Sequence, residues 1–340
     1  MAKIGIIGAG TWGTALGLLL YRNGHQVTLW SAFEEDAKNL AENRKHKNLP
    51  GIKLPGEMAF TASMEAAMAD KEAVVLAVPS IYVRSTARLM SPFCRKGQII
   101  VNVAKGIEES TLMTLSQVIE EELPQAQVTV LSGPSHAEEV SRGVPTTCVA
   151  GAASKDQAQK IQNLFMGPAF RVYISPDMLG IELGGALKNV IALAAGIADG
   201  LEYGDNTKAA LITRGIREIG RLGMKMGGKF ETFSGLSGIG DLIVTCASMH
   251  SRNRRAGILI GQGYTMEEAM REVNMVVEGV YSAKAAWKLA EKYQVPMPIV
   301  EQVNLVLFHG KDPALGVQEL MMRDKTSETD TEMWGEQAER

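Results

Sequence analysis

Short apolar runs alternate with amphipathic segments along the first half of the chain. The runs are rich in β-branched residues and carry few charges, as strands do in a parallel sheet covered on both faces. They span Ile4–Ile7, Val27–Trp30, Val74–Val78, Ile99–Val103, Val128–Leu131, Thr146–Val149 and Arg171–Ile174. The segments between them have helical periodicity, at Thr14–Arg22, Glu34–Asn43, Ile81–Met90 and Leu112–Glu122. This alternation predicts an α/β fold, with an N-terminal Rossmann-type doubly wound sheet over residues 1–180.

After about Pro176 the strand patterns stop and long helical patterns follow. The predicted helices span Asp177–Ala198, Thr207–Met226, Ile239–Ala247, Asn253–Gln262, Thr265–Val273, Tyr281–Lys292 and Ile299–Leu307. They predict a C-terminal all-helical, substrate-binding domain over residues 181–323. Residues 324–340 lack an apolar face apart from Met333 and Trp334, which predicts a mobile tail.

Length and charge narrow the class of protein. A chain of 340 residues predicts two domains, and 46% hydrophobic with 21% charged residues is ordinary for a globular enzyme. The net charge of -3 gives no general attraction to nucleic acid or anionic membranes. The start, MAKIGIIGAG, does not have the pattern of a signal peptide, and the three cysteines have no metal-ligand spacing. We therefore expect a cytoplasmic protein with a small-molecule substrate and no metal site.

A lysine lies in the most apolar helical stretch, Gly180–Gly200. The stretch is long enough to cross a membrane, but its polar residues Glu182, Asn189 and Asp199 favour a buried helix and no stable membrane insertion. Burying the Lys188 ammonium costs several kcal/mol, so it needs a partner or loses its proton more readily. Such a lysine suits proton transfer near neutral pH. The alternative is a structural lysine on a polar rim that caps a helix or pairs with Glu182.

Residues 8–13, GAGTWG, directly follow the first predicted strand and open a helix. Gly8 permits the tight turn, Gly10 lets the backbone approach a pyrophosphate, and Gly13 allows close packing of strand and helix. The helix N-terminus supplies N–H donors to the phosphates. In this context the motif predicts a site for NAD or NADP.

The choice between NAD and NADP depends on the end of the second predicted strand, where the ribose 2′ position lies. Ala32 and Phe33 offer neither a carboxylate for a ribose hydroxyl nor an arginine for a 2′-phosphate. Glu34, Glu35 and Asp36 follow, and they either repel a 2′-phosphate or are favourable acids in the first turn of a helix. The sequence leaves this choice open.

Further polar residues stand where predicted strands and helices begin or end. Lys105 ends a strand, where open α/β sheets bind ligands, although an exposed loop lysine fits equally well. The segment 132–138, SGPSHAE, offers small residues and free N–H groups at a helix start. Asp241, in the glycine-rich GLSGIGD, orients a substrate hydroxyl, holds Lys188, or is an acid in the first turn of a helix.

Residues 251–255, SRNRR, precede an apolar helix. Serine, arginine and asparagine at a helix start form a phosphate cradle, with the guanidinium supplying bidentate donors. The alternative is a solvated basic patch. Glu278, in VVEG, either meets a ribose or amide of the cofactor or starts a helix. Together, these residues predict a dinucleotide cleft with an unusual lysine and a phosphate-binding helix start.

Seven motifs resemble those of the bacterial NAD(P)-dependent glycerol-3-phosphate dehydrogenase family. They are GAGTWG at 8–13, AKG at 104–106, SGPSHAEE at 132–139, ELGGALKN at 182–189, GLSGIGDL at 235–242, HSRNRR at 250–255 and VVEG at 276–279. The resemblance implies reversible reduction of dihydroxyacetone phosphate to sn-glycerol 3-phosphate, feeding glycerophospholipid synthesis, in a cytoplasmic homodimer. The alternatives are another dehydrogenase with Rossmann and helical domains that acts on a hydroxy acid, and a non-catalytic dinucleotide sensor.

The resemblance also implies roles for single residues. Lys188 matches the family's proton acceptor. The positions that hold the triose phosphate are matched by Lys105, Gly133, Ser135, Lys188, Asp241, Ser251, Arg252 and Asn253. The positions that touch NAD or NADP are matched, besides Gly8, Gly10 and Gly13, by Thr11, Trp12, Lys105, Ala137, Arg252, Val276 and Glu278. The family often has a histidine or arginine where this chain has Ala32 and Phe33, so a preference for NADPH is unsupported at these positions.

Overall fold

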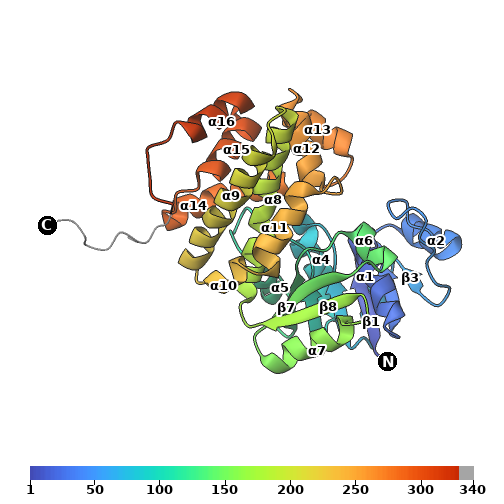
Figure 1. Ribbon diagram of the computed structural model, residues 1–340. Helices are drawn as coiled ribbons and strands as arrows, with labels where there is room; N and C mark the ends of the chain where they lie inside the picture. Colours follow the sequence, from blue (N-terminus) through green and yellow to red (C-terminus); the bar gives the residue numbers. More distant parts are fainter. Residues whose placement is uncertain (329–340) are drawn as a thin grey trace.

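An eight-stranded, mostly parallel sheet forms the centre of the N-terminal half of the protein (Figure 1). The computed structural model describes residues 1–328. Within them the strand order is β3-β2-β1-β4-β5-β6-β7-β8, and the pairing of β6 with β7 is antiparallel while the others are parallel. The strands are β1 (Lys3–Ile7), β2 (Gln26–Trp30), β3 (Ala59–Thr61), β4 (Ala73–Leu76), β5 (Ile99–Asn102), β6 (Gln127–Ser132), β7 (Thr146–Ala152) and β8 (Phe170–Ser175). The prediction of a Rossmann-type sheet is confirmed.

The glycine turn lies where the strand order reverses. β1 pairs with β2 on one side and with β4 on the other, so the connections after β1 and β4 leave the sheet at one edge and run to opposite sides. Open α/β sheets bind ligands in the crevice at this point. The fold therefore places residues 8–13, and the segment that follows β4, at the ligand-binding edge.

Helices cover both faces of the sheet, as the scarcity of charges in its strands predicts. One face packs under α1, α6 and α7, and the other packs under α3, α4 and α5. In β4, Val75 points to the first group and its neighbours Val74 and Leu76 point to the second, because side chains alternate along a pleated strand. The helices of this half are α1 (Thr11–Arg22), α2 (Glu34–Asn43), α3 (Met64–Met68), η1 (Ser80–Tyr82), α4 (Val83–Met90), η2 (Ser91–Phe93), α5 (Leu115–Glu122), α6 (Ala137–Arg142) and α7 (Lys155–Phe165).

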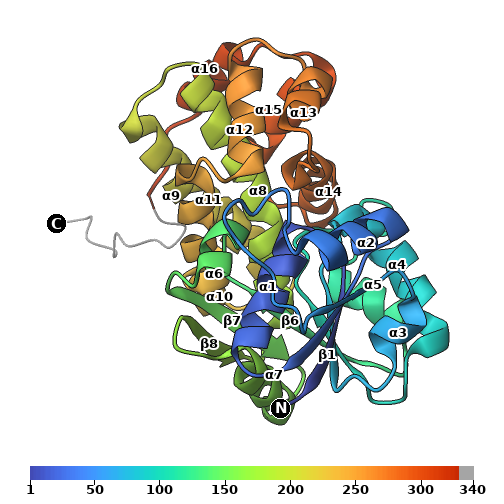
Figure 2. The same ribbon diagram turned by 90° about the vertical axis from the view of Figure 1, so that its right-hand side faces the viewer.

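The C-terminal half is helical, as predicted, and in Figures 1 and 2 its helices lie together on one side of the sheet. Helix α8 runs through the middle of this half and reaches the sheet. It is long and apolar enough to cross a membrane, but 94% of its most apolar 18-residue stretch is buried inside the protein. The helices are α8 (Met178–Gly200), α9 (Asp205–Lys225), α10 (Phe230–Phe233), η3 (Leu236–Gly240), α11 (Asp241–Ala247), α12 (Arg252–Gly261), α13 (Met266–Val273), α14 (Glu278–Tyr293), α15 (Pro298–His309) and α16 (Pro313–Met321).

The backbones of α8 and α12 touch through glycines. A Cβ atom added to Gly257 would lie 2.3 Å from the carbonyl oxygen of Leu193, and one added to Gly196 would lie 2.1 Å from that of Arg254. One turn further along, Gly200 and Gly261 meet in the same way. Only glycine allows two helices to approach this closely, so the position of α12 on α8 is fixed by the main chain.

The structure differs from the sequence prediction at several boundaries. Helix α5 begins at Leu115 and not at Leu112, because Thr114 and Gln117 form a capping box at its start. Helix α11 begins at Asp241 and not at Ile239, because a π-turn with non-helical dihedrals at Gly238 precedes it. Among the elements that were not predicted are β3, α3, α7, α10 and α16, whereas α6 was predicted only as a helix start after residues 132–136.

The predicted domain boundary and tail remain predictions. Helix α8 begins at Met178, close to the boundary predicted between residues 180 and 181. Of the predicted tail, residues 324–328 are described, and there Glu328 forms a salt bridge with Arg214. The remainder, residues 329–340, lies outside the described residues.

Candidate active site

Lys188 lies on the buried face of α8 and forms an ion pair with Asp241. Its Nζ atom is 2.6 Å from Asp241 Oδ1 and 2.5 Å from Thr245 Oγ1, and the residue is only 5% exposed. Asp241 and Thr245 are four residues apart on α11, so they lie on one side of that helix. The predicted partner Asp241 is confirmed. The alternative partner Glu182 is wrong, because its carboxylate accepts hydrogen bonds from Ser116 and Asn102 instead.

A second lysine shares the same carboxylate. Lys105, in the loop after β5, has its Nζ 2.6 Å from Asp241 Oδ2 and 3.0 Å from the carbonyl oxygen of Gly133. That carbonyl also accepts a hydrogen bond from Ser135 Oγ at 2.9 Å. The structure therefore brings together five predicted residues from four segments of the chain. Two ammonium groups face one carboxylate, which leaves the cluster with an excess positive charge.

Burial and charge shift the pKa values of this cluster in opposite directions. Burial lowers the pKa of Lys188 to about 8, and Lys105 acts in the same direction while Asp241 opposes both. Burial alone would raise the pKa of Asp241, but the two lysines outweigh burial and hold it below its ordinary value. Asp241 thus remains a carboxylate, and Lys188 can gain or lose a proton near neutral pH.

The start of α12 is a second cationic feature, and the structure separates its three arginines. Ser251 caps the helix, with its Oγ accepting from the backbone N–H of Arg254. The Arg254 side chain is engaged by Asp199 at 2.7 Å, and Arg255 is exposed. The Arg252 side chain is half-buried and forms no hydrogen bond or salt bridge with residues 1–328. Burial lowers the pKa of Arg252, an effect opposed by Glu278 and Glu138.

Asn253 has its side chain committed to the scaffold. Its Nδ2 donates to Asn189 Oδ1 at 2.9 Å, and its Oδ1 accepts from the backbone N–H of Gly279 at 2.8 Å. These bonds tie α12 to α8, next to Lys188, and to the start of α14. Asn189 was not identified from the sequence, although its position beside Lys188 in ELGGALKN was a signal.

The glycine turn fits a dinucleotide pyrophosphate. Gly8 has φ +118°, and a Cβ added to Gly13 would lie 1.9 Å from the carbonyl oxygen of Gly8. A Cβ added to Gly10 would meet nothing within 4 Å, so there is open space in front of the turn. Helix α1 starts there with no side-chain cap and no acid in its first turn, which leaves N–H groups free for an anion.

Glu278 joins the helical half to the sheet domain. Its carboxylate accepts hydrogen bonds from both the backbone N–H and the Oγ of Ser80, in the connection after β4. Ser80 also packs against Gly106, where a Cβ would lie 2.3 Å from the Ser80 Cβ. Ser80 was missed by sequence reasoning, because no motif surrounds it.

Other predicted cofactor residues lie around the glycine turn and the start of α14. Trp12 is half-buried on α1, and Ala137 is buried at the start of α6 against the same face of the sheet. Val276 is half-buried beside Met275, whose sulfur lies 3.9 Å from Asn48 Nδ2. Asn48 also donates to Thr11 Oγ1 at 3.2 Å. In residues 1–328, no group of three or more His, Cys, Asp or Glu side chains is placed to hold a metal ion.

Comparisons with known proteins agree on one family. Residues 3–158 match the NAD-dependent glycerol-3-phosphate dehydrogenase N-terminus, and residues 177–318 match the C-terminus of the same family. A protein of Agathobacter rectalis named glycerol-3-phosphate dehydrogenase [NAD(P)+] is 62% identical over 335 residues, which cover 98% of this chain and 100% of that protein. A protein of the same name from Fusobacterium nucleatum is 60% identical over 331 residues, which cover 96% of this chain and 99% of that protein.

A solved structure supports the same assignment. The crystal structure of glycerol-3-phosphate dehydrogenase from Coxiella burnetii is 37% identical and matches with a TM-score of 0.91 over 95% of this chain and 99% of that one. Since both halves match one family and the curated relatives align over nearly their whole length, the chain has the domains of an NAD(P)-dependent oxidoreductase. This protein belongs to the NAD-dependent glycerol-3-phosphate dehydrogenase family.

Proposed function

We propose that the protein reversibly reduces dihydroxyacetone phosphate to sn-glycerol 3-phosphate, with Lys188 as the general acid and base. The observation that carries the proposal is the buried Lys188 ammonium, held at 2.6 Å by Asp241. The nicotinamide, when bound, supplies or accepts the hydride. Lys188 donates a proton to the oxygen that forms from the substrate carbonyl, and in the reverse direction the neutral amine removes that proton.

The hydrogen bonds of Lys188 support this role. An ammonium group has three N–H donors, and two are used by Asp241 and Thr245. One donor remains for a substrate oxygen. A pKa of about 8 means that both protonation states are accessible near neutral pH, which a reversible proton transfer requires.

Substrate binding is proposed for the residues around this pair. Lys105 also has one donor left after its bonds to Asp241 and Gly133, and with Ser135 it flanks the proposed position of the substrate oxygens. The phosphate is assigned to the start of α12, formed by Ser251, Arg252 and Asn253.

Three donor groups at the start of α12 support the phosphate assignment. The backbone N–H groups of Arg252 and Asn253 are at the first two positions of the helix, where they have no acceptor within the helix. The Arg252 guanidinium has no protein partner in residues 1–328 and supplies a further charged donor. Because the Asn253 side chain is committed to Asn189 and Gly279, its contribution is its backbone N–H.

The proposed cofactor site follows the crevice from the glycine turn to the start of α14. The turn and the first N–H groups of α1 hold the pyrophosphate, and the residues near Lys105 surround the nicotinamide end. The proposed contacts are Gly8, Gly10, Thr11, Trp12, Gly13, Lys105, Ala137, Arg252, Val276 and Glu278. The open space at Gly10 and the uncapped start of α1 support this assignment.

We further propose a cytoplasmic homodimer whose product feeds glycerophospholipid synthesis. The support is the family membership, because sn-glycerol 3-phosphate is the backbone precursor of these lipids. The apolar side chains of Phe230, Ile243 and Met249 are at least 49% exposed and provide surface for a second copy. Light scattering on the purified protein tests the dimer.

The central experiment follows reduced nicotinamide absorbance with dihydroxyacetone phosphate. Lys188→Met should lower kcat by at least about 10²-fold, the lower end of the range for acid–base catalysis, while NADH or NADPH still binds. The matched control is Lys208→Met, which removes an ion pair with Asp199 elsewhere in the helical half. Retention of kcat by Lys188→Met within tenfold of the wild type would show that another group transfers the proton.

A further inference from the structure

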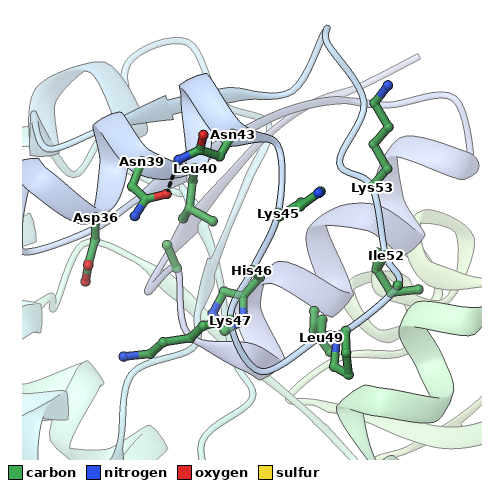
Figure 3. Close-up of a pocket in the computed structure, with 13 residues that line it drawn as sticks. Asp36, Asn39, Leu40, Asn43, Lys45, His46, Lys47, Leu49, Ile52 and Lys53 are labelled. Atoms are coloured by element: carbon green, nitrogen blue, oxygen red, sulfur yellow. Dashed lines mark hydrogen bonds between the residues drawn. The ribbon is translucent and has the colours of Figure 1, made fainter.

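A pocket of about 510 Å³ lies between helix α2 and the loop of residues 44–53, beside the glycine turn (Figure 3). Ala9 of the turn is part of its lining. The charged side chains in the lining are one carboxylate, Asp36, and three ammonium groups, Lys45, Lys47 and Lys53. The pocket therefore carries a net positive charge next to the proposed pyrophosphate site.

The loop is attached to the glycine turn on both sides of Lys47. The residue before it, His46, lies near the backbone of Ala9, and both residues line the pocket. The residue after it, Asn48, donates from Nδ2 to Thr11 Oγ1 at 3.2 Å. Lys47 itself is exposed and forms no hydrogen bond or salt bridge within residues 1–328. Its backbone is thus held against the cofactor turn while its ammonium is available.

The Lys47 side chain extends toward the start of α2, close to the end of β2 in the sequence. The end of β2 carries Ala32 and Phe33, which provide no charge. Figure 3 shows the Lys47 side chain extending to the side of the pocket where Asp36, in the first turn of α2, lies. Lys45 and Lys53 extend from the other side of the pocket.

We propose that Lys47 binds the 2′-phosphate of NADPH and makes the protein prefer NADPH to NADH. In a dinucleotide fold the ribose 2′ position lies at the end of the second strand, where α2 begins. A phosphate there requires a charged donor, whereas the hydroxyl of NADH gains little from one. Of the three acids that open α2, Glu34 is already paired with Lys38 at 2.9 Å. The proposal depends on the dinucleotide site and not on the roles of Lys188 or Arg252.

The test compares 2′-phospho-ADP-ribose with ADP-ribose, which differ only in the phosphate. Binding of each to the full chain is measured by calorimetry. The wild type should bind the 2′-phosphorylated ligand at least about tenfold more tightly, the ratio expected for one charged hydrogen bond. Lys47→Gln should remove this ratio without changing the affinity for ADP-ribose, and Lys47→Arg should preserve it.

Lys45→Gln and Lys53→Gln are matched controls, because each removes the same charge from the other side of the pocket. Each should change the binding ratio less than about threefold, in the range of a weak surface charge effect. The kcat/KM ratio of NADPH to NADH should follow the binding ratio in every variant.

Three results would overturn the proposal. They are an unchanged ratio in Lys47→Gln, equal losses in all three lysine variants, and a wild type that binds ADP-ribose as tightly as its 2′-phosphorylated form. If the binding results hold but dihydroxyacetone phosphate is not reduced, the proposed function fails and the Lys47 assignment stands.

Discussion

The Oδ1 atom of Asp241 lies 2.6 Å from the Nζ atom of Lys188, and both residues are at least 95% buried. The second oxygen of Asp241 is bound by Lys105, so this single carboxylate balances two ammonium groups. Separating such a charge from its partner is expensive in a dry environment, because the remaining charges are left uncompensated. Asp241 therefore contributes both to the stability of the cluster and to the proton affinity of Lys188, which burial lowers.

Asp241→Asn should shift the pH profile of reduction toward acid. With the carboxylate gone, Lys105 and burial lower the pKa of Lys188 without its opposing charge, by about 1 unit or more. The free energy of unfolding should fall by about 3–5 kcal/mol, as it does when one partner of a buried pair is removed. Measuring kcat/KM across pH, with a thermal melt, checks both effects.

Asp199→Asn is the matched control for this change. Asp199 also binds two cations, Lys208 and Arg254, but at the other end of α8. The Asp199→Asn variant should have a lower melting temperature than the wild type and an unchanged pH profile of reduction. A shift of the same size in both variants would contradict a specific effect of Asp241 on Lys188.

The two directions of the reaction should depend on pH in opposite ways around pH 8. The pKa of Lys188 is lowered to about 8, so its acid form prevails below this pH and its neutral form prevails above it. Reduction needs the acid, so its kcat/KM should fall as pH rises through 8. Oxidation of sn-glycerol 3-phosphate needs the base, so its kcat/KM should rise over the same interval. Parallel pH profiles in the two directions would exclude Lys188 as the shared group.

The three arginines at the start of α12 should respond differently to substitution by glutamine. Arg252→Gln should raise KM for dihydroxyacetone phosphate by about tenfold or more, because it removes a charged donor to the phosphate. Activity on unphosphorylated dihydroxyacetone, however low, should change little. Arg254→Gln should instead lower the melting temperature, since its guanidinium binds Asp199. Arg255→Gln should resemble the wild type, because this side chain is exposed. Equal losses with both substrates in Arg252→Gln would exclude a phosphate contact.

Gly257→Ala should destabilise the protein by about 1–3 kcal/mol, the range for overpacking a well-filled interior. The new methyl group would lie 2.3 Å from the carbonyl oxygen of Leu193 and force α12 away from α8. Gly220→Ala, in α9, is the control, because its Cβ would meet only Phe233 at an ordinary 3.9 Å. Since alanine favours a helix over glycine by about 1 kcal/mol, this variant should be as stable as the wild type or more stable. Urea denaturation of both variants measures the difference.

The Lys188–Asp241 pair was predictable because a charge inside an apolar helix requires a counter-charge, and Asp241 lies in a glycine-rich segment that permits close approach. The sharing of this carboxylate with Lys105 was not, because it depends on how residues 136 positions apart meet in the folded chain. Sequence also could not separate Arg252 from Arg254, since both occur in one basic run. The helix directs one guanidinium to Asp199 and leaves the other without a partner among residues 1–328. Strand β3 escaped prediction because three residues are too few to show an alternating pattern.

The glycine contact between α8 and α12 has a consequence for substrate choice. Lys188 lies on one of these helices and Arg252 starts the other, so main-chain atoms that no side-chain replacement can trim hold the two in register. For the proposed reaction, this contact fixes the distance between the carbon that is reduced and the phosphate. A substrate with one more carbon between these groups would have to spread two helices that are already in backbone contact. Selectivity for molecular length would then reside in the scaffold, and the pocket side chains would be left to select for charge.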